Sequence, residues 1–410
     1  MSLHASDDPA LTSALITRRR FDLRSALRAK LERALGVGHL NVETPDGRCF
    51  VLDSGRPGPR GEIVLHRWRA VRRLLLGGDL GFAESYIDGD WSSQDLATLL
   101  ALGAMNIEMV DRAARALWPV RALNRLRHVA RRNSRRGSAR NISEHYDLGN
   151  DFYTAWLDPG MTYSSALYRD DDETLEQAQD NKYRRSLELL ALSGGEQVLE
   201  IGCGWGAMAE ALLASGVGGV MAITLSREQR DYAIRRLGHD VRATVSLKDY
   251  RDIGGTYDRI VSIEMLEAVG EENWPRYFRV LNDRLKPGGT AVLQFITIAD
   301  HRYGAYRRGA DFIQRHIFPG GMLPSPAVVR RHIFDAGLTL AEVETFGESY
   351  ARTLAVWRQR FDVAWPSIQA LGFPTPFKRK WDYYLAYCEA GFRSGLLDVG
   401  LYRLEKPAGG

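Results

Sequence analysis

The stretch Val198-Leu-Glu-Ile-Gly-Cys-Gly-Trp-Gly206 decides the expected fold of this 410-residue chain. Its first residues are typical of a buried strand, and three glycines then lead into a helical pattern over 207–213. Because glycine has no Cβ, the backbone can turn sharply here and approach a ligand closely. Glu200 stands at the strand end, where it can orient the turn. These features predict a nucleotide-like cofactor at the carboxyl edge of a parallel sheet.

The spacing of the glycines distinguishes between two classes of cofactor. Dinucleotide-binding enzymes carry Gly-x-Gly-x-x-Gly at this turn. Here Gly202, Gly204 and Gly206 form Gly-x-Gly-x-Gly instead. The difference favours S-adenosylmethionine over a dinucleotide.

Length and composition indicate an ordinary globular protein with room for two domains. The apolar stretches are shorter than the ~20 residues that a membrane span needs, and the N-terminus lacks the layout of a secretory signal. The three cysteines (Cys49, Cys203 and Cys388) are far apart, which predicts neither a disulfide framework nor a metal site. We therefore expect a cytoplasmic protein.

Arginine is concentrated in one segment of the chain. Residues 112–143 hold ten arginines and no acidic residue, although the whole chain has a net charge of only +4. Such a block attracts phosphate-bearing surfaces, and a solvated basic linker is the alternative interpretation. Nothing nearby resembles a nucleic-acid-binding signature, so anionic lipid headgroups are the favoured partner and no nucleic acid is expected.

The pattern of the chain changes after residue 140. Residues 1–110 combine a basic amphipathic helix over 14–35, several short strands over 37–65 and two helical patterns near 66–76 and 96–102, which predicts a small α+β accessory domain. Residues 111–140 form the arginine-rich linker. No internal repeat is evident.

Residues 141–410 alternate between strand and helix patterns. Strands are expected at 197–202, 220–225, 243–247, 258–264, 290–298, 339–346 and 397–404. This alternation predicts an α/β, doubly wound parallel sheet closed by a final strand pair, as in the seven-stranded class I methyltransferases. The segment 299–335 is too long for a plain connection and is predicted to be a substrate lid.

Several motifs in a fixed order resemble the cyclopropane-fatty-acid synthase family, which includes the mycolic acid cyclopropane synthases. They include His145-Tyr-Asp-Leu148, Met161-Thr-Tyr-Ser-Ser-Ala166, the glycine turn, Met265-Leu-Glu-Ala-Val-Gly270 and Ile317-Phe-Pro-Gly-Gly321. The resemblance covers residues 141–404, and the N-terminal region looks like the accessory domain of longer bacterial members. It implies methyl transfer from S-adenosylmethionine to a cis double bond in a phospholipid acyl chain.

The resemblance also implies a cofactor site. The backbone of Gly202–Gly206 would approach the methionine and ribose parts of S-adenosylmethionine, and Tyr163 and Ser164 would close over the cofactor. The remaining candidates follow later strands: Thr224, Leu225 and Gln229 for hydrogen bonds, Asp249 for the adenine amino group, and Tyr250 for stacking on the ring. Simple core packing is the alternative for Tyr250.

An alkene gives a carbocation when it accepts a methyl group, so a base must remove a proton in a site shielded from water. In the ring-forming relatives a bound bicarbonate is thought to be this base. The positions that would hold it correspond here to Ser165, Glu267, Gln294, the backbone of Ile296, and Tyr350. Two of the five positions differ from the family, because serine replaces cysteine and glutamine replaces histidine.

Glu264 occupies a position that is glycine in the ring-forming enzymes. Its carboxylate, near Glu267, could take the place of the bicarbonate ion, and an ordinary polar strand end is the alternative. Bicarbonate therefore stays only a doubtful second cofactor. Cys388 matches a cysteine treated as an active-site residue in the family, although a small buried apolar role suits it equally.

We expect a C-methyltransferase acting on unsaturated acyl chains of membrane phospholipids, peripheral at the inner face of the membrane. The product is a cyclopropane or a methyl- or methylene-branched chain. The alternatives are an amine N-methyltransferase for a small molecule and a non-catalytic lipid-surface binding protein, against which the intact glycine motif and Glu267 argue. The sequence leaves room for a homo-oligomer.

Overall fold

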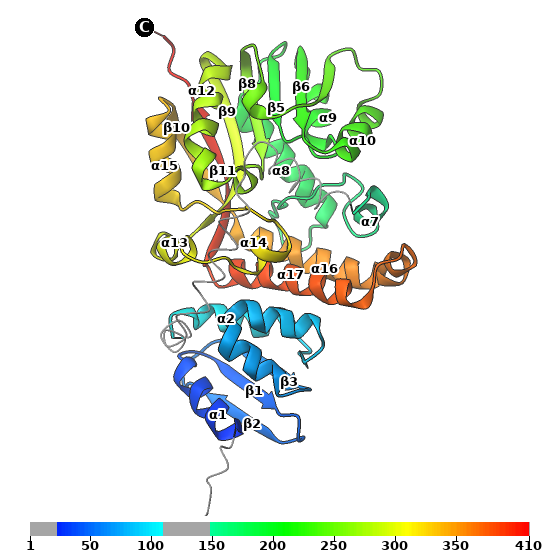
Figure 1. Ribbon diagram of the computed structural model, residues 1–410. Helices are drawn as coiled ribbons and strands as arrows, with labels where there is room; N and C mark the ends of the chain where they lie inside the picture. The colour runs from blue at the N-terminus through cyan, green and yellow to red at the C-terminus, as the bar shows by residue number, and fades with distance from the viewer. Residues whose placement is uncertain (1–22, 110–147, 410) are drawn as a thin grey trace, which may run out of the picture.

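The computed structural model describes residues 23–109 and 148–409, and it contains two separate sheets (Figure 1). The arginine block at 112–143 and the linker boundaries at 110 and 140 lie outside the described residues. The expected N-terminal helix is described from residue 23 on, as α1 (Leu23–Ala34). The proposed division into domains therefore stays a prediction.

The larger sheet has seven strands. They are β5 (Gln197–Ile201), β6 (Gly219–Thr224), β7 (Ala243–Leu247), β8 (Tyr257–Ile263), β9 (Leu285–Ile298), β10 (Thr339–Thr345) and β11 (Leu397–Glu405). Their order is β10-β11-β9-β8-β5-β6-β7, with β5 to β9 parallel and β11 antiparallel to both its neighbours. This arrangement confirms the expected class I methyltransferase sheet and all seven strand positions. Strand β9 begins at Leu285, ahead of the expected residue 290, because Leu285 pairs with Tyr257 before the register shifts.

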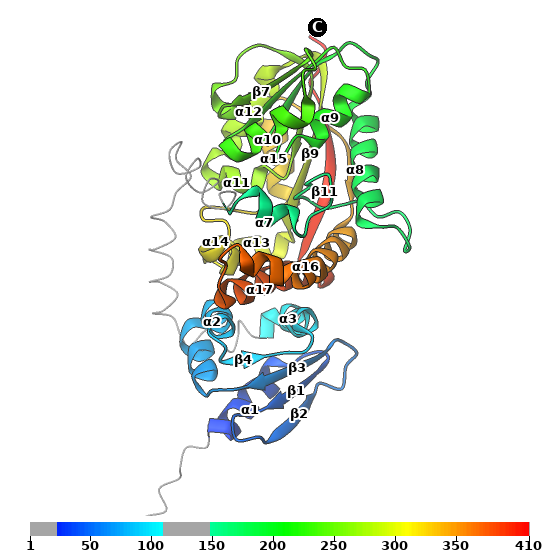
Figure 2. The same cartoon turned by 90° about the vertical axis from the view of Figure 1, so that its right-hand side faces the viewer.

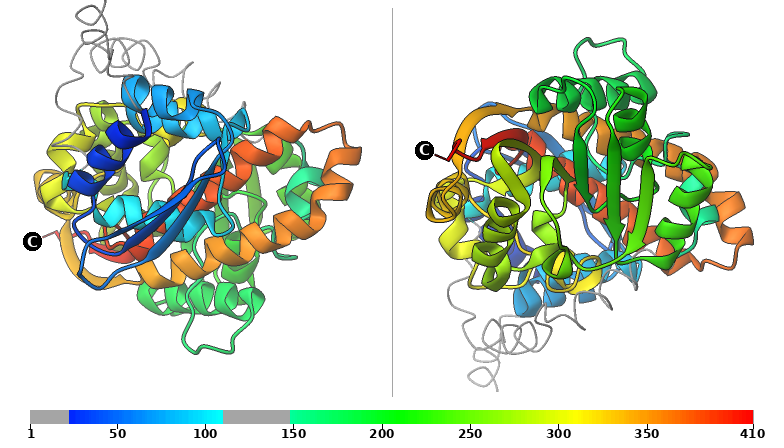
Figure 3. Two further views of the ribbon diagram at one scale, coloured as in Figure 1. Left: turned by 90° about the horizontal axis from the view of Figure 1, so that it is seen from below. Right: turned by 90° about the horizontal axis from the view of Figure 1, so that it is seen from above.

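Alternating side chains build two cores, one on each face of the sheet. Val198 packs into the core beneath α8 (Leu175–Leu190) and α9 (Ala207–Ala214), whereas Leu199 packs into the core beneath α12 (Trp274–Arg284) and α15 (Pro326–Asp335). Figure 3 (right) shows the strands between these two helical layers. Both faces of β5 are therefore buried, which explains its nearly continuous apolar sequence.

Two long helices, α16 (Gly347–Ala370) and α17 (Thr375–Arg393), cross below the sheet and pack against each other. Figure 2 shows them between the large sheet and the N-terminal region. Aromatic side chains on these helices, among them Trp357, Phe361 and Trp381, are buried. Phe361 and Trp381 contact each other, and both contact Phe152 of α7 (Asn150–Thr154).

The smaller sheet has the order β2-β1-β3-β4. Its strands are β1 (His39–Glu43), β2 (Cys49–Asp53), β3 (Arg60–Leu65) and β4 (Trp91–Ser92), and its helices are α2 (Arg69–Ile87) and α3 (Leu96–Met105). Helix α2 extends past the expected end near 76, because Gly78 (φ 60°) permits a kink after which the helix continues.

Helix α17 joins the smaller sheet's helices to the rest of the molecule. Arg379 donates hydrogen bonds to the carbonyl oxygens of Tyr86 (2.6 Å) and Trp91 (2.9 Å), and the Tyr86 hydroxyl donates to Asp382 (2.7 Å). The guanidinium of Arg379 also lies 4.5 Å from the centre of the Tyr86 ring. Within the described residues, no helix is both long and apolar enough to cross a membrane.

Candidate active site

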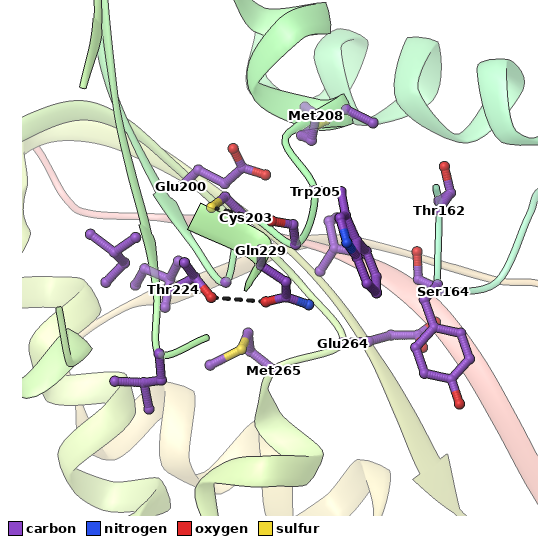
Figure 4. Close-up of a pocket in the computed structure, with 18 of the residues that line it drawn as sticks. Thr162, Ser164, Glu200, Cys203, Trp205, Met208, Thr224, Gln229, Glu264 and Met265 are labelled. Atoms are coloured by element: carbon purple, nitrogen blue, oxygen red, sulfur yellow. Dashed lines mark hydrogen bonds between the residues drawn. The ribbon is translucent and has the colours of Figure 1, made fainter. Parts of the chain in front are cut away.

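A pocket opens where the carboxyl ends of β5, β6 and β8 meet. The loop before α8 and η2 (Tyr250–Asp252) complete its wall. Among the residues that line it are Tyr163, Ser164, Glu200, Gly202, Gly204, Thr224, Leu225, Gln229, Lys248, Tyr250, Glu264 and Met265. Figure 4 shows Ser164 and Glu264 on one side of this pocket and Thr224 and Gln229 on the other.

The glycine turn has the geometry that a close ligand requires. Gly202 (φ 85°), Gly204 (φ 51°) and Gly206 (φ 89°) all have left-handed backbones, which glycine adopts most readily. A Cβ on Gly202 would lie 2.4 Å from the Met265 side chain, whereas a Cβ on Gly204 would meet nothing within 4 Å. Gly204 therefore presents bare backbone to open space in the pocket. Gly206 lies outside the lining and begins α9.

Glu200 is the buried acid of this turn. Its side chain is almost fully buried, and Oε2 has no hydrogen-bond partner among the described residues. Burial raises the pKa of Glu200 to about 8. A cationic ligand nearby would stabilise the ionised form of this buried carboxyl group. The ammonium in the methionine part of S-adenosylmethionine has the required charge.

On the opposite side, the Thr224 hydroxyl donates to Oε1 of Gln229 (2.8 Å; Figure 4). The Tyr250 hydroxyl is buried without a partner among the described residues, as expected of a group left for a ligand or water. These residues fit the polar ribose and adenine parts of S-adenosylmethionine.

Asp249 was expected at the adenine amino group, but it is not part of the pocket wall. Both of its carboxylate oxygens bind the guanidinium of Arg251, at 2.8 and 2.5 Å. Lys248, its neighbour, does line the pocket, and its place just after β7 was the only signal for it in the sequence. The role of Asp249 toward the adenine stays a prediction.

Glu264 lies at the end of β8, at the pocket wall nearest β9. Its Oε1 accepts hydrogen bonds from the backbone N–H of Ser165 (2.8 Å) and from Nε2 of Gln294 (2.8 Å), and its Oε2 accepts from the Tyr350 hydroxyl (2.7 Å). Three segments far apart in the sequence thus converge on one carboxylate. All three donors were expected to surround a bicarbonate ion.

The backbone of Glu264 is left-handed (φ 50°), a conformation that costs most residues about 1 kcal/mol and costs glycine little. Glycine would be the unstrained choice here. A strained glutamate whose carboxylate is held by three donors suggests that the carboxylate itself is needed.

Glu267 lies in the short helix α11 (Leu266–Val269), which directly follows the end of β8. Its Oε1 accepts from the backbone N–H of Ile296 (2.6 Å), and its Oε2 is buried without a partner among the described residues. Burial and the charge of Glu264 raise the pKa of Glu267 to about 8. The pKa of Glu264 is also raised, because burial outweighs the hydrogen bonds from Ser165 and Tyr350, which lower it.

The donor groups assigned to bicarbonate by resemblance are therefore already satisfied by the protein's own carboxylates. The Ser165 hydroxyl is also engaged, because it donates to the carbonyl oxygen of Ala166 (2.9 Å). The residues present do not fit a bound bicarbonate in this arrangement.

Cys388 is partly buried, and its pKa is raised by burial, which disfavours a reactive thiolate.

Lys182 was not expected from the sequence. It lies on α8, fully buried, and its Nζ donates to the Ser164 hydroxyl (2.7 Å). The available signal was its spacing, since Ala178, Lys182, Ser186 and Leu189 fall on one face of the helix and all are buried.

In the described residues, no group of three or more His, Cys, Asp or Glu side chains is arranged to hold a metal ion.

The strand order, the glycine turn and the pocket at the carboxyl ends define a class I S-adenosylmethionine-dependent methyltransferase. The profile of the mycolic acid cyclopropane synthetase family matches residues 133–401, and the chain belongs to this family. It is 41% identical to the tuberculostearic acid methyltransferase UfaA1 of Mycobacterium tuberculosis, over 84% of each chain.

Two further comparisons agree. The chain is 36% identical to the cyclopropane-fatty-acyl-phospholipid synthase of Escherichia coli, over 81% of this chain and 84% of that protein. It also matches the structure of the mycolic acid cyclopropane synthase CmaA1 complexed with SAH and CTAB, with a TM-score of 0.61 and 32% identity. That match covers 65% of this chain and 98% of the other. The chain is thus an S-adenosylmethionine-dependent methyltransferase of the cyclopropane fatty acid synthase family.

Proposed function

We propose that this enzyme methylates a cis-unsaturated acyl chain of a membrane phospholipid, that Glu264 is the base of the reaction, and that the product is methyl- or methylene-branched rather than cyclic. The observation that carries the proposal is the Glu264 carboxylate, held by Ser165, Gln294 and Tyr350 beside the cofactor pocket. Because both products need a base at this place, the choice of a branched product rests on the similarity to a tuberculostearic acid methyltransferase.

S-adenosylmethionine supplies a methyl group from its sulfonium centre. The alkene's π electrons form the new C–C bond, and the neighbouring alkene carbon becomes positively charged. A hydride shift moves this charge to the methylated carbon. Loss of a proton from the new methyl group then leaves a methylene branch, whereas loss of a proton from a neighbouring chain carbon leaves a methyl branch beside a double bond. Ring closure differs only in that the same C–H electron pair bonds to the first cationic carbon.

In either case one proton must be accepted close to the transferred methyl group. An ionised Glu264 can accept it, and the negative charge also favours the cation before the proton leaves. Glu267 has a pKa of about 8, and one of its oxygens has no hydrogen-bond partner in the described part of the chain, so it is suited to hold a proton next to this site. The Tyr350 phenol is held protonated, because burial and Glu264 raise its pKa well above the usual value.

Product analysis tests the proposal. Purified enzyme, S-adenosylmethionine and phospholipid vesicles with cis-unsaturated chains should yield fatty acids heavier by one CH2 unit. Proton NMR should then show a vinylic methylene group or a methyl branch. Ring protons at high field would overturn the branched product, and methylation of small amines with no change in the lipids would favour an N-methyltransferase.

The same proposal includes a peripheral membrane location at the inner leaflet. An acyl chain in a bilayer is reached only from the membrane surface, and the ten arginines of 112–143 carry the charge to bind anionic headgroups. The segment 299–335 would act as the substrate lid. It contains α13 (Asp300–Tyr306), α14 (Phe312–His316) and α15, and its Met322 N–H donates to the Glu267 carbonyl oxygen (2.8 Å).

A further inference from the structure

Lys182 is a buried cation that the reaction described above does not use. It projects from the middle of α8 and has no exposed surface. A lysine is almost never fully buried unless its charge is compensated, because removing an ammonium from water is costly. Its position therefore needs a physical reason beyond packing.

Side chains of helix α8 form hydrogen bonds with the loop that carries Ser164. Gln179 donates to the Ser164 carbonyl oxygen (3.0 Å), and Lys182 Nζ donates to the Ser164 hydroxyl oxygen (2.7 Å). The Tyr183 hydroxyl lies 2.8 Å from the Thr162 hydroxyl. Because an ammonium can only donate, the Ser164 hydroxyl must accept from Lys182 and keeps its own proton for another acceptor. Ser164 lines the pocket, so a cofactor oxygen can be that acceptor.

Two carboxylates act electrostatically on this ammonium. The charged groups that act on Lys182 are Glu264 at the end of β8 and Asp158 before the Ser164 loop, and both favour its protonated form. Asp158 is buried and accepts hydrogen bonds from the Thr162 N–H (3.0 Å) and hydroxyl (3.2 Å). The effect is reciprocal, because Lys182 in turn lowers the pKa of Glu264.

We propose that Lys182 is a positioning residue that directs the Ser164 hydroxyl toward S-adenosylmethionine and places a buried positive charge near Glu264, whose carboxylate is bound by the next residue, Ser165. The second part rests on the proposed role of Glu264 as base, whereas the first part does not. Lys182 touches neither cofactor nor substrate in this scheme and acts through Ser164 and Glu264.

The electrostatic part gives the turnover rate a specific dependence on pH. Burial lowers the pKa of Lys182 to about 7, with Glu264 and Asp158 opposing the shift. As the pH rises through this range Lys182 loses its proton, and the charge that lowers the pKa of Glu264 is lost. Wild-type turnover at saturating S-adenosylmethionine should therefore rise with pH as Glu264 ionises, and the rise should become less steep once Lys182 loses its proton.

Two substitutions at Lys182 separate charge from hydrogen bonding. Lys182→Met keeps the stem and removes both, whereas Lys182→Gln removes the charge and keeps a donor for Ser164. In each folded variant the acid limb of the pH–rate profile should move upward by about one pH unit, the size expected from losing a nearby opposite charge. An unmoved acid limb in both variants would overturn the electrostatic part.

Cofactor binding tests the other part without any turnover. Calorimetry should show S-adenosylmethionine affinity falling about tenfold in Lys182→Met and in Ser164→Ala, and less in Lys182→Gln. Lys378→Met, which removes a partly exposed lysine paired with Asp362 on α16, is the matched control and should bind normally. If neither Lys182 variant folds, Ser164→Ala decides, and unchanged affinity there overturns the proposal.

The outcomes also separate this inference from the proposed function. Full activity of Glu264→Gln would refute Glu264 as the base but leave the calorimetric result for Lys182 standing. Conversely, a branched lipid product from wild type, together with unchanged affinity and pH profile in the Lys182 variants, would refute only the role of Lys182.

Discussion

The Tyr350 hydroxyl donates a 2.7 Å hydrogen bond to Oε2 of Glu264, joining the first turn of α16 to the end of β8. The phenol remains a donor, because burial and the adjacent carboxylate raise the pKa of Tyr350 well above its usual value. A fixed donor on Oε2 and two more on Oε1 hold the Glu264 carboxylate in one orientation. Such fixed orientation is what a base needs at a short-lived cation.

Replacing Glu264 by glutamine keeps the shape of the side chain and removes the proton acceptor. We expect turnover to fall on the order of 10²-fold or more, with little loss of S-adenosylmethionine affinity, measured by single-turnover kinetics and calorimetry. Glu210→Gln, which alters an exposed carboxylate on α9, is the control. Near-normal turnover by Glu264→Gln would show that another group takes the proton.

Bicarbonate should have little effect on the wild type, because the carboxylate is already tethered at high effective concentration. Glu264→Gly removes the carboxylate and the left-handed backbone strain together, and it frees the donors of Ser165, Gln294 and Tyr350. Its residual turnover should rise when bicarbonate is added. Rate measurements with and without bicarbonate in degassed buffer test this, and strong stimulation of the wild type would contradict it.

Gly204→Val should abolish S-adenosylmethionine binding while the protein stays folded. The substituted side chain would enter open space in the pocket rather than the core, and φ of 51° is unfavourable for a β-branched residue. Calorimetry measures the binding, and circular dichroism measures the fold. Unchanged affinity would mean that the cofactor lies elsewhere.

Binding of S-adenosylmethionine should release a proton near neutral pH. In the free enzyme the pKa of Glu200 is about 8, so the carboxyl is largely protonated at pH 7. A cationic ammonium beside it favours the ionised form, and affinity should therefore increase as the pH rises from 6 to ~8. Calorimetry in two buffers of different ionisation enthalpy measures the release. Glu200→Gln should remove it, and release that persists in this variant would assign the proton to another group.

Membrane binding should depend on the arginine block. Replacing Arg131, Arg132, Arg135 and Arg136 by glutamine should reduce co-sedimentation with anionic vesicles, whereas the corresponding lysine variant should bind normally. Because the attraction is electrostatic, wild-type binding should weaken as salt rises. Equal binding to neutral vesicles at high salt would exclude this docking role.

Much of the fold could be predicted because local patterns specify it. A strand buried on both faces, such as Gln197–Ile201, has a nearly continuous apolar sequence. The glycines that follow readily adopt the left-handed backbone that the turn requires. The kinked continuation of α2 through Gly78 was missed, because a Gly-Gly pair usually ends a helix and tertiary packing continued this one. For the arginine block, only its positive charge could be predicted.

The sequence by itself therefore determined the sheet and the cofactor turn, and it predicted Glu264 as a site residue. Only the tertiary structure decided what Glu264 touches, because Ser165, Gln294 and Tyr350 come from segments that no local pattern connects. It likewise turned Asp249 toward Arg251 and placed Lys182 beneath Ser164. Hydrogen bonds and buried charges depend on distances between atoms, and those distances exist only once the separate elements have packed together.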